Sequence, residues 1–239
     1  MRINKFISES GFCSRREADK LVESGRVTIN GMKAELGSQA ENGDDVRVDG
    51  KRIGAHRSHV YIALNKPVGI TSTTESHVRG NIVDFVGHSE RIFPIGRLDK
   101  DSEGLILLTN DGDIVNRILR AEGSHEKEYV VTVDRAVTPA FIKGMSEGVK
   151  VLGSLTLPCK VTPVSDRVFR IILTEGRNRQ IRRMCTAFGY QVKRLQRIRV
   201  MNIKLGQLPA GSWRDLTEEE RNTLFHSLEY TPSSPAQRR

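Results

Sequence analysis

Hydrophobic and polar positions along the first fifty residues predict a small module of two helices followed by strands. One face of the first helix carries apolar residues at helical spacing: Ile3, Phe6 and Ile7. Residues 14–17 (Ser-Arg-Arg-Glu) have the spacing of a capping box, and Gly25 is placed to end the helix that begins there. Alternation at 27–29 precedes an Asn-Gly turn signal, and a further strand is predicted at 46–48.

The pattern after residue 59 predicts a larger unit of mixed strands and helices, joined to the first by a polar linker at 51–59. Short apolar or alternating runs predict strands at 61–64, 105–108, 129–133, 169–173 and 194–200. Helical spacing predicts helices at 82–86, 113–119 and 179–188. The last ten residues, 230–239, are rich in Pro and Ser, so we expect them to be frayed.

Composition narrows the class of protein. Hydrophobic residues make up 37% of the 239 residues, which is typical of a globular chain rather than a disordered one. No apolar run approaches the roughly 20 residues needed to span a bilayer, and the N-terminus lacks the apolar stretch of a signal peptide. The three cysteines are odd in number and far apart, which argues against a disulfide framework and fits a reducing cytoplasm.

Positive charge is concentrated in one block of the chain. The net charge is +9, and residues 161–200 carry 10 Lys and Arg against 2 Asp and Glu. The segments on either side are nearly balanced, with 12 against 13 in residues 60–160 and 5 against 5 in residues 201–239. Such concentration indicates a surface for a polyanion. A membrane surface is disfavoured because the block has little amphipathic Trp or Phe character.

An aspartate in the run PIGRLDKDSEGLILLTNDGD at 94–113 is the best candidate for chemistry. Asp99 follows Gly-Arg-Leu and precedes an apolar strand, so a loop beside a rigid strand would present it to a substrate. A solvated surface turn is the alternative. A metal cluster of Asp99, Asp101 and Glu103 is disfavoured by the intervening Lys100, and His56 with His59 lacks completing ligands.

The N-terminal string RINKFISESGFCSRREADKLVESGRVTINGM resembles the S4 RNA-binding domain over roughly residues 1–50. Two arginines in the first turn of a helix are mildly unfavourable, which itself suggests an anion beside them. The resemblance implies binding of structured RNA by the helix pair and the following hairpin. It makes the basic residues of this segment candidates for phosphate contact: Arg2, Lys5, Arg15, Arg16 and Lys20.

Four further segments together resemble the pseudouridine synthases, and within them the RsuA family. They are NKPVGITST at 65–73, GRLDKDSEGLILLTNDGD at 96–113, HEKEY at 125–129 and RNRQIRRMC at 177–185. The resemblance covers nearly the whole chain. Within the family, the pattern is most similar to an enzyme of the large ribosomal subunit.

The resemblance implies conversion of a flipped-out uridine to pseudouridine without a metal or an organic cofactor. Asp99 is then the catalytic carboxylate, Tyr129 stacks on the uracil, and Arg182 pairs with the aspartate and keeps it ionised. Arg97 matches a residue that fills the space left by the flipped base. The remaining arginines of the basic block are expected to bind RNA phosphates: Arg177, Arg179 and Arg183. Without the resemblance, Tyr129 could be a core aromatic and Arg182 one more phosphate-binding residue.

The sequence therefore predicts an α+β protein: an S4-like module with its linker at 1–58, a catalytic domain at 59–230 and a flexible tail at 231–239. The catalytic domain is expected to be built on a mixed, mostly antiparallel sheet. The expected partner is 23S ribosomal RNA or its assembly intermediate, with tRNA as a second substrate. We expect a cytoplasmic monomer. Two alternatives are an RNA-binding or ribosome-assembly factor without catalysis, and a hydrolase that only cuts the glycosidic bond.

Overall fold

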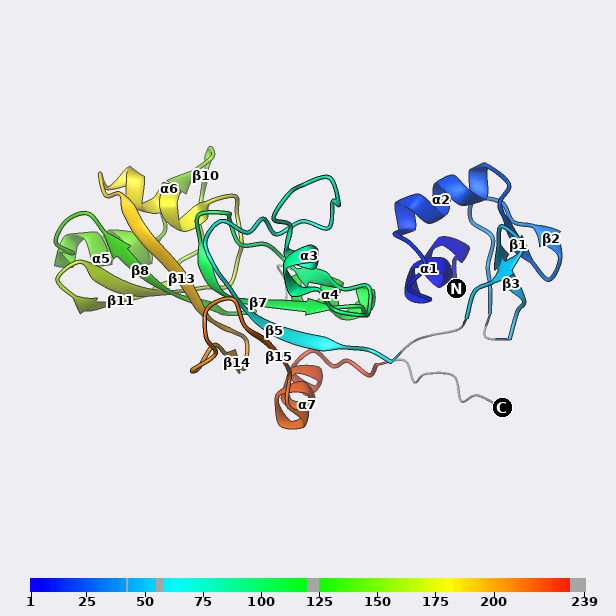
Figure 1. The fold of residues 1–239 in the computed structure, drawn as a ribbon. Helices are drawn as coiled ribbons and strands as arrows, with labels where there is room; N and C mark the ends of the chain where they lie inside the picture. Colours follow the sequence, from blue (N-terminus) through cyan, green and yellow to red (C-terminus); the bar gives the residue numbers. More distant parts are fainter. Residues whose placement is uncertain (42, 55–57, 120–124, 233–239) are drawn as a thin grey trace.

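The computed structural model describes residues 1–239 except 42, 55–57, 120–124 and 233–239, and these form a small N-terminal module and a larger sheet domain (Figure 1). The module contains helices α1 (Ile3–Glu9) and α2 (Arg15–Glu23). Its four-stranded antiparallel sheet has the order β2-β1-β3-β4. The strands are β1 (Val27–Ile29), β2 (Met32–Lys33), β3 (Val46–Val48) and β4 (Lys51–Arg52).

The sequence features that predicted this module have the expected structural roles. The Ser14 hydroxyl accepts a hydrogen bond from the amide of Glu17, and a carboxylate oxygen of Glu17 accepts one from the Ser14 amide at 2.8 Å. Both helices bury their apolar faces against β1 and β3. The prediction of a linker beginning at residue 51 was wrong, because β4 pairs with β3 and Ile53 is buried in the module's core.

A nine-stranded mixed sheet forms the larger domain. Its main path has the order β11-β12-β8-β13-β7-β5-β15, with β14 paired to β13 and β6 to β7. Only β13 and β7 are parallel, so the prediction of a mostly antiparallel sheet is confirmed. The strands are β5 (Tyr61–Lys66), β6 (Phe93–Ile95), β7 (Glu103–Thr109), β8 (Lys127–Val133), β11 (Lys160–Ser165), β12 (Val168–Leu173), β13 (Val192–Val200), β14 (Ile203–Lys204) and β15 (Trp213–Asp215).

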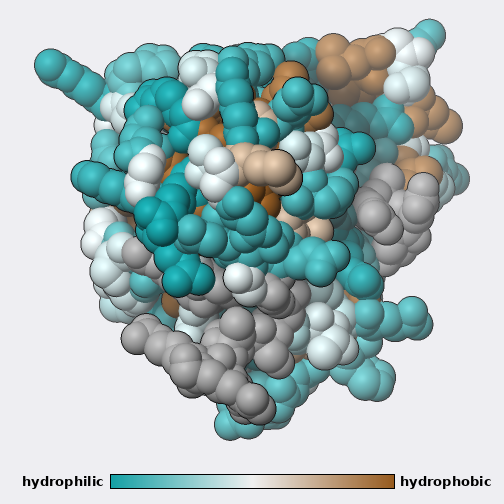
Figure 2. Space-filling model, turned by 90° about the vertical axis from the view of Figure 1, so that its right-hand side faces the viewer, coloured by the Kyte–Doolittle hydropathy of each residue, from teal (hydrophilic) through white to brown (hydrophobic). Residues whose placement is uncertain are grey.

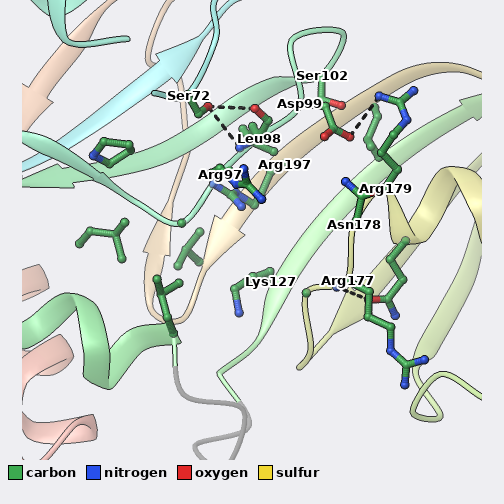
Figure 3. Close-up of a pocket in the computed structure, with 18 of the residues that line it drawn as sticks. Ser72, Arg97, Leu98, Asp99, Ser102, Lys127, Arg177, Asn178, Arg179 and Arg197 are labelled. Atoms are coloured by element: carbon green, nitrogen blue, oxygen red, sulfur yellow. Dashed lines mark hydrogen bonds and ion pairs between the residues drawn. The ribbon is translucent and has the colours of Figure 1, made fainter. Parts of the chain in front are cut away.

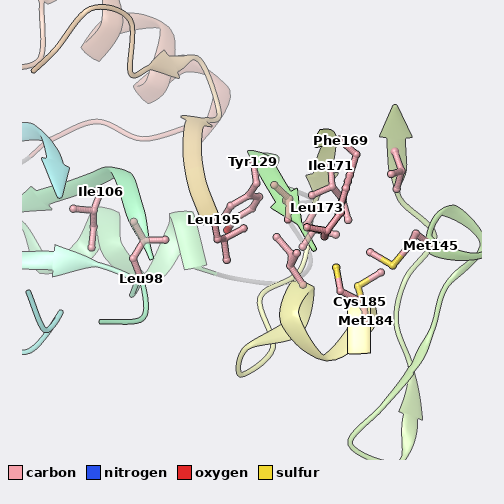
Figure 4. Close-up of a cluster of buried hydrophobic side chains, with 14 of the residues drawn as sticks. Leu98, Ile106, Tyr129, Met145, Phe169, Ile171, Leu173, Met184, Cys185 and Leu195 are labelled. Atoms are coloured by element: carbon pink, nitrogen blue, oxygen red, sulfur yellow. The ribbon is translucent and has the colours of Figure 1, made fainter. Parts of the chain in front are cut away.

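Helices lie on both faces of this sheet. One apolar cluster, shown in part in Figure 4, packs the sheet against α3 (Ile82–Val86), α5 (Pro139–Glu147) and α6 (Gln180–Ala187). A second cluster packs it against α4 (Gly112–Leu119) and α7 (Glu218–Ser227). A separate two-stranded hairpin consists of β9 (Lys150–Val151) and β10 (Ser154–Leu155). Strands β5 and β7 alternate between the two clusters, which explains why they are continuous apolar runs in the sequence.

The parallel contact between β7 and β13 depends on Gly104. An ideal Cβ at this position would lie 2.3 Å from the carbonyl oxygen of Arg197, and its φ is +100°. Only glycine accepts both the backbone conformation and the close approach. The approach brings the middle of β13 next to the loop that precedes β7, and this loop contains Asp99.

The end of the chain is partly fixed to the larger domain. The expectation of fraying from residue 230 was wrong for Tyr230, whose hydroxyl donates to Asp111 at 2.5 Å and whose ring lies against Phe225. The rest of the expected tail falls mostly outside the described residues.

Among the described residues, no helix combines the length and hydropathy that crossing a membrane requires. The face in Figure 2 is mainly hydrophilic, with hydrophobic side chains in separate places.

Candidate active site

Asp99 lies on a turn between β6 and β7 that is hydrogen-bonded on both sides. The Ser72 hydroxyl donates to the carbonyl of Leu98 at 2.9 Å and accepts from its amide at 3.3 Å (Figure 3). The Gly69 amide donates to the carbonyl of Lys100 at 2.8 Å. These bonds join the turn to residues 69–72, so the position of the Asp99 backbone does not depend on solvated side chains.

The Asp99 side chain lines a cavity of about 880 Å³, which is within the size range of small-molecule sites. The walls come from six separate segments of the chain: 71–74, 93–100 with Ser102, 118–119 at the end of α4, part of β8, 173 with 175–181, and part of β13. Of the expected RNA-binding residues, Arg97, Arg177 and Arg179 line it. The Asp99 side chain retains 32% of its surface exposure, so its carboxylate is accessible from the cavity.

Tyr129 lies in the wall of the same cavity. It is 9% exposed and packs in the apolar cluster shown in Figure 4. Strand register places it directly opposite Ile171 on β12 and Arg197 on β13. Tyr129 is therefore both a core aromatic and a cavity residue, and it can offer part of its ring to a bound base.

The arginine nearest the Asp99 carboxylate is Arg179, at 3.6 Å from its Nη1 atom. Arg179 also binds both carboxylate oxygens of Asp101, at 3.1 and 2.9 Å. The expected pairing of Asp99 with Arg182 was wrong, because Arg182 Nη2 donates to the carbonyl of Asp101 at 2.9 Å and to the Ser102 hydroxyl at 3.3 Å. Arg182 therefore holds the segment after Asp99 and does not line the cavity.

Arg179 and Arg182 together stabilise the ionised form of Asp101. Hydrogen bonds from Arg179 are the main reason that the pKa of Asp101 is lowered, and the charge of Arg182 acts in the same direction. Arg179 itself has a left-handed backbone with φ of +49° at the N-terminus of α6. Among the described residues, no group of three or more acids, His or Cys is arranged to hold a metal ion.

Comparisons with known proteins fit this geometry. Residues 60–187 match the family model for RNA pseudouridylate synthases, and residues 1–46 match that of the S4 domain. The chain is 58% identical over 98% of its length to the dual-specificity RNA pseudouridine synthase RluF of Escherichia coli K12, covering 81% of that protein. It is 33% identical to the ribosomal large subunit pseudouridine synthase B of Bacillus subtilis, over 93% of this chain and 95% of that one.

The chain belongs to the RNA pseudouridine synthases. A solved pseudouridylate synthase has the same fold, with a TM-score of 0.69, 30% identity and coverage of 94% of this chain and 99% of that one. The prediction of an S4 module in front of a synthase domain of the RsuA type is confirmed.

A buried lysine of the synthase, which sequence reasoning missed, lies close to the Asp99 turn. Lys66 ends β5 with no exposed surface, and its Nζ donates to the carbonyls of Pro67 at 2.9 Å and Ile70 at 3.0 Å. Burial lowers the pKa of Lys66 to about 8, against the attraction of nearby Asp101 and Asp99. In the sequence, this lysine looks like the polar start of a turn, because it precedes a proline.

Two of the expected RNA-binding arginines in the synthase are partly engaged with the protein itself. Arg177 forms an ion pair with Glu175 at 2.8 Å, and its Nη2 donates to the carbonyl of Leu155 at 2.6 Å. It thereby ties the β9–β10 hairpin to the cavity. Arg183 donates to the Asn178 carbonyl and side chain, both at 3.1 Å.

The S4 residues of the synthase are mostly on the surface. The side chains of Arg2, Arg15, Arg16 and Lys20 are exposed. Lys5 differs, because its Nζ lies 2.7 Å from a carboxylate oxygen of Asp113 at the start of α4. Lys5 therefore links the module to the larger domain.

Proposed function

We propose that this synthase isomerises a specific uridine in folded ribosomal RNA of the large subunit, with Asp99 as the catalytic carboxylate. The observation that carries the proposal is the position of Asp99. Its carboxylate is on a hydrogen-bonded turn at a cavity that Tyr129 also lines. The names of the relatives support the substrate, since one is a ribosomal large subunit enzyme and another has dual specificity.

The reaction breaks the bond from N1 of uracil to C1′ of ribose and forms a bond from C5 to C1′. The C5 proton is released to solvent and N1 takes up a proton, so the product has the same atoms as uridine. A carboxylate can act as the nucleophile that carries the reacting fragment between the two bonds, as in retaining glycosidases. A uracil within a folded helix has to leave the stack first, which costs a few kcal/mol.

The other site residues have supporting roles in this proposal. Tyr129 stacks on the flipped uracil and keeps it in the cavity while its orientation changes. Arg179 holds a positive charge beside the Asp99 carboxylate, and Arg182 positions the turn through Asp101 and Ser102. Arg97 lines the cavity and offers a planar cation to the gap that the flipped base leaves.

The test compares two neighbouring aspartates. Asp99→Asn should abolish tritium release from RNA labelled at uridine C5 by at least about 10³-fold and leave RNA binding in place. Asp101→Asn is the matched control, since Asp101 is on the same turn and pairs with the same arginine but does not line the cavity. Equal loss in the two variants, or turnover by Asp99→Asn, would refute the role of Asp99.

The finer substrate choice follows from the same proposal. We propose 23S ribosomal RNA, naked or in an assembly intermediate, as the first substrate and a tRNA uridine as the second. Purified synthase incubated with each RNA, followed by chemical mapping of pseudouridine, separates them. We also propose that the synthase is a monomer in the cytoplasm, and the free thiols of the described cysteines, Cys13, Cys159 and Cys185, fit that reducing compartment.

A further inference from the structure

Two cations, Arg197 and Lys127, lie beside Tyr129 in the wall of the cavity. Arg197 on β13 is the direct partner of Tyr129 on the antiparallel strand β8, so their side chains leave the sheet on the same face. Lys127 is two residues before Tyr129 on β8, which also places it on that face. Both cations line the cavity, and both are labelled in Figure 3.

Neither cation has a carboxylate partner among the described residues. Arg197 is 4% exposed, and its Nε donates to the carbonyl of Leu105 at 2.6 Å. No further hydrogen bond of its guanidinium to a described residue is found, so the Nη edge is available to the cavity. Lys127 donates to the carbonyl of His125 at 3.0 Å. The nearby Arg199, by contrast, pairs with two glutamates.

The proximity of these two positive charges is electrostatically unfavourable. Burial, followed by the positive charge of Arg197, lowers the pKa of Lys127. Two like charges kept together without a counter-ion are stabilised when an anion binds between them. The cavity acids do not serve this purpose, because Glu175 is bound to Arg177 and Asp99 has Arg179 beside it.

We infer that Arg197 and Lys127 form a subsite for a backbone phosphate of the target RNA strand. This inference rests on the proposed function and adds the group that the two cations recognise. A guanidinium with its Nε already bound presents a fork that matches phosphate oxygens, and the lysine adds a point charge. Uracil is neutral and would leave both charges uncompensated, whereas every nucleotide of the strand carries one phosphate.

The decisive variant is Lys127→Gln, made in the Asp99→Asn chain so that binding is measured without turnover. The matched control is Lys193→Gln, which removes the same charge from an exposed position on β13 outside the cavity. The probe is transcribed 23S ribosomal RNA, and its Kd is measured against KCl concentration. A lost phosphate contact reduces the slope of log affinity against log salt by about 0.7 to 0.9.

We expect this reduction in Lys127→Gln and an unchanged slope in Lys193→Gln. The ratio of the Kd of Lys127→Gln to that of its parent should then fall about threefold between about 0.05 and 0.2 M KCl. An unchanged slope in Lys127→Gln would overturn the inference. Arg197→Gln should reduce the salt slope as Lys127→Gln does, and Arg197→Lys should restore it. Thermal unfolding of each Arg197 variant shows whether it still folds.

Failure of this inference is distinguishable from failure of the proposed function. If the wild-type synthase forms no pseudouridine in the same 23S transcript, the substrate proposal is wrong. If it forms pseudouridine and the slope is the same in Lys127→Gln and its parent, only the phosphate subsite is wrong.

Discussion

The buried ammonium of Lys66 should make the stability of the synthase depend on alkaline pH. The perturbation is Lys66→Met, which keeps an unbranched side chain one atom shorter and removes its charge. In the wild type, the ammonium is fully buried and donates to the carbonyls of Pro67 and Ile70. Because residues 69–72 hold the Asp99 turn, the same interaction supports the position of the Asp99 carboxylate.

The sign of the effect follows from the pKa of Lys66, which burial lowers from an ordinary 10.5 to about 8 in the folded state. Between these two values, the unfolded chain holds a proton that the folded chain has lost, so the free energy of unfolding rises with pH. Below the folded-state pKa of about 8, Lys66 is protonated in both the folded and the unfolded chain, and the cost of burying its ammonium is present in full. Relative to pH 7, the wild type should gain about 1.4 kcal/mol by pH 9 and about 2.5 kcal/mol by pH 10.

The assay is equilibrium unfolding in urea at pH 7, 8, 9 and 10 for both chains. The quantity compared is the difference in unfolding free energy between wild type and Lys66→Met, since other titrating groups contribute equally to both. We expect this difference to shift in favour of the wild type by the amounts above. A difference that stays constant from pH 7 to 10, or that shifts in favour of the variant, would refute the buried-ammonium reasoning.

Two further predictions concern the frame of the site. Gly104→Ala should destabilise the fold by about 3 kcal/mol or more, since the added Cβ meets the Arg197 backbone and the φ of residue 104 is positive. Urea unfolding measures this loss of stability, and a loss below about 1 kcal/mol would contradict the prediction. Arg179→Gln should lower kcat roughly fivefold, because a charge 3.6 Å from Asp99 near solvent contributes about 1 kcal/mol. Tritium release at saturating RNA measures it, and an unchanged kcat would show that Arg179 does not act on Asp99.

Local signals in the sequence were sufficient for most elements of the fold. The capping box at Ser14, the apolar runs of β5 and β7 and the helical spacing of α4 and α6 each depend on neighbours within a few residues. The presence of a turn at Asp99 is also a local signal, since two apolar segments flank it, whereas hydrogen bonds from residues 69–72 fix its position. These features were therefore predictable without knowledge of the tertiary structure.

Side-chain partners across the sheet were not predictable in the same way. Arg179 and Arg182 are three residues apart at the start of α6, and spacing alone cannot tell which one reaches Asp99. The left-handed backbone of Arg179 and the position of the turn decide this. Arg197 looks like a solvent-facing residue of an alternating strand, but pairing with β7, about ninety residues earlier, buries it.

The measurement that tests the central claim most directly is chemical mapping of pseudouridine in ribosomal RNA from cells without the gene. The account predicts that a uridine of 23S ribosomal RNA loses its modification on deletion. Expression of the wild-type synthase should restore it, and expression of Asp99→Asn at the same level should not. Restoration by Asp99→Asn, or an unchanged map after deletion, would contradict the account.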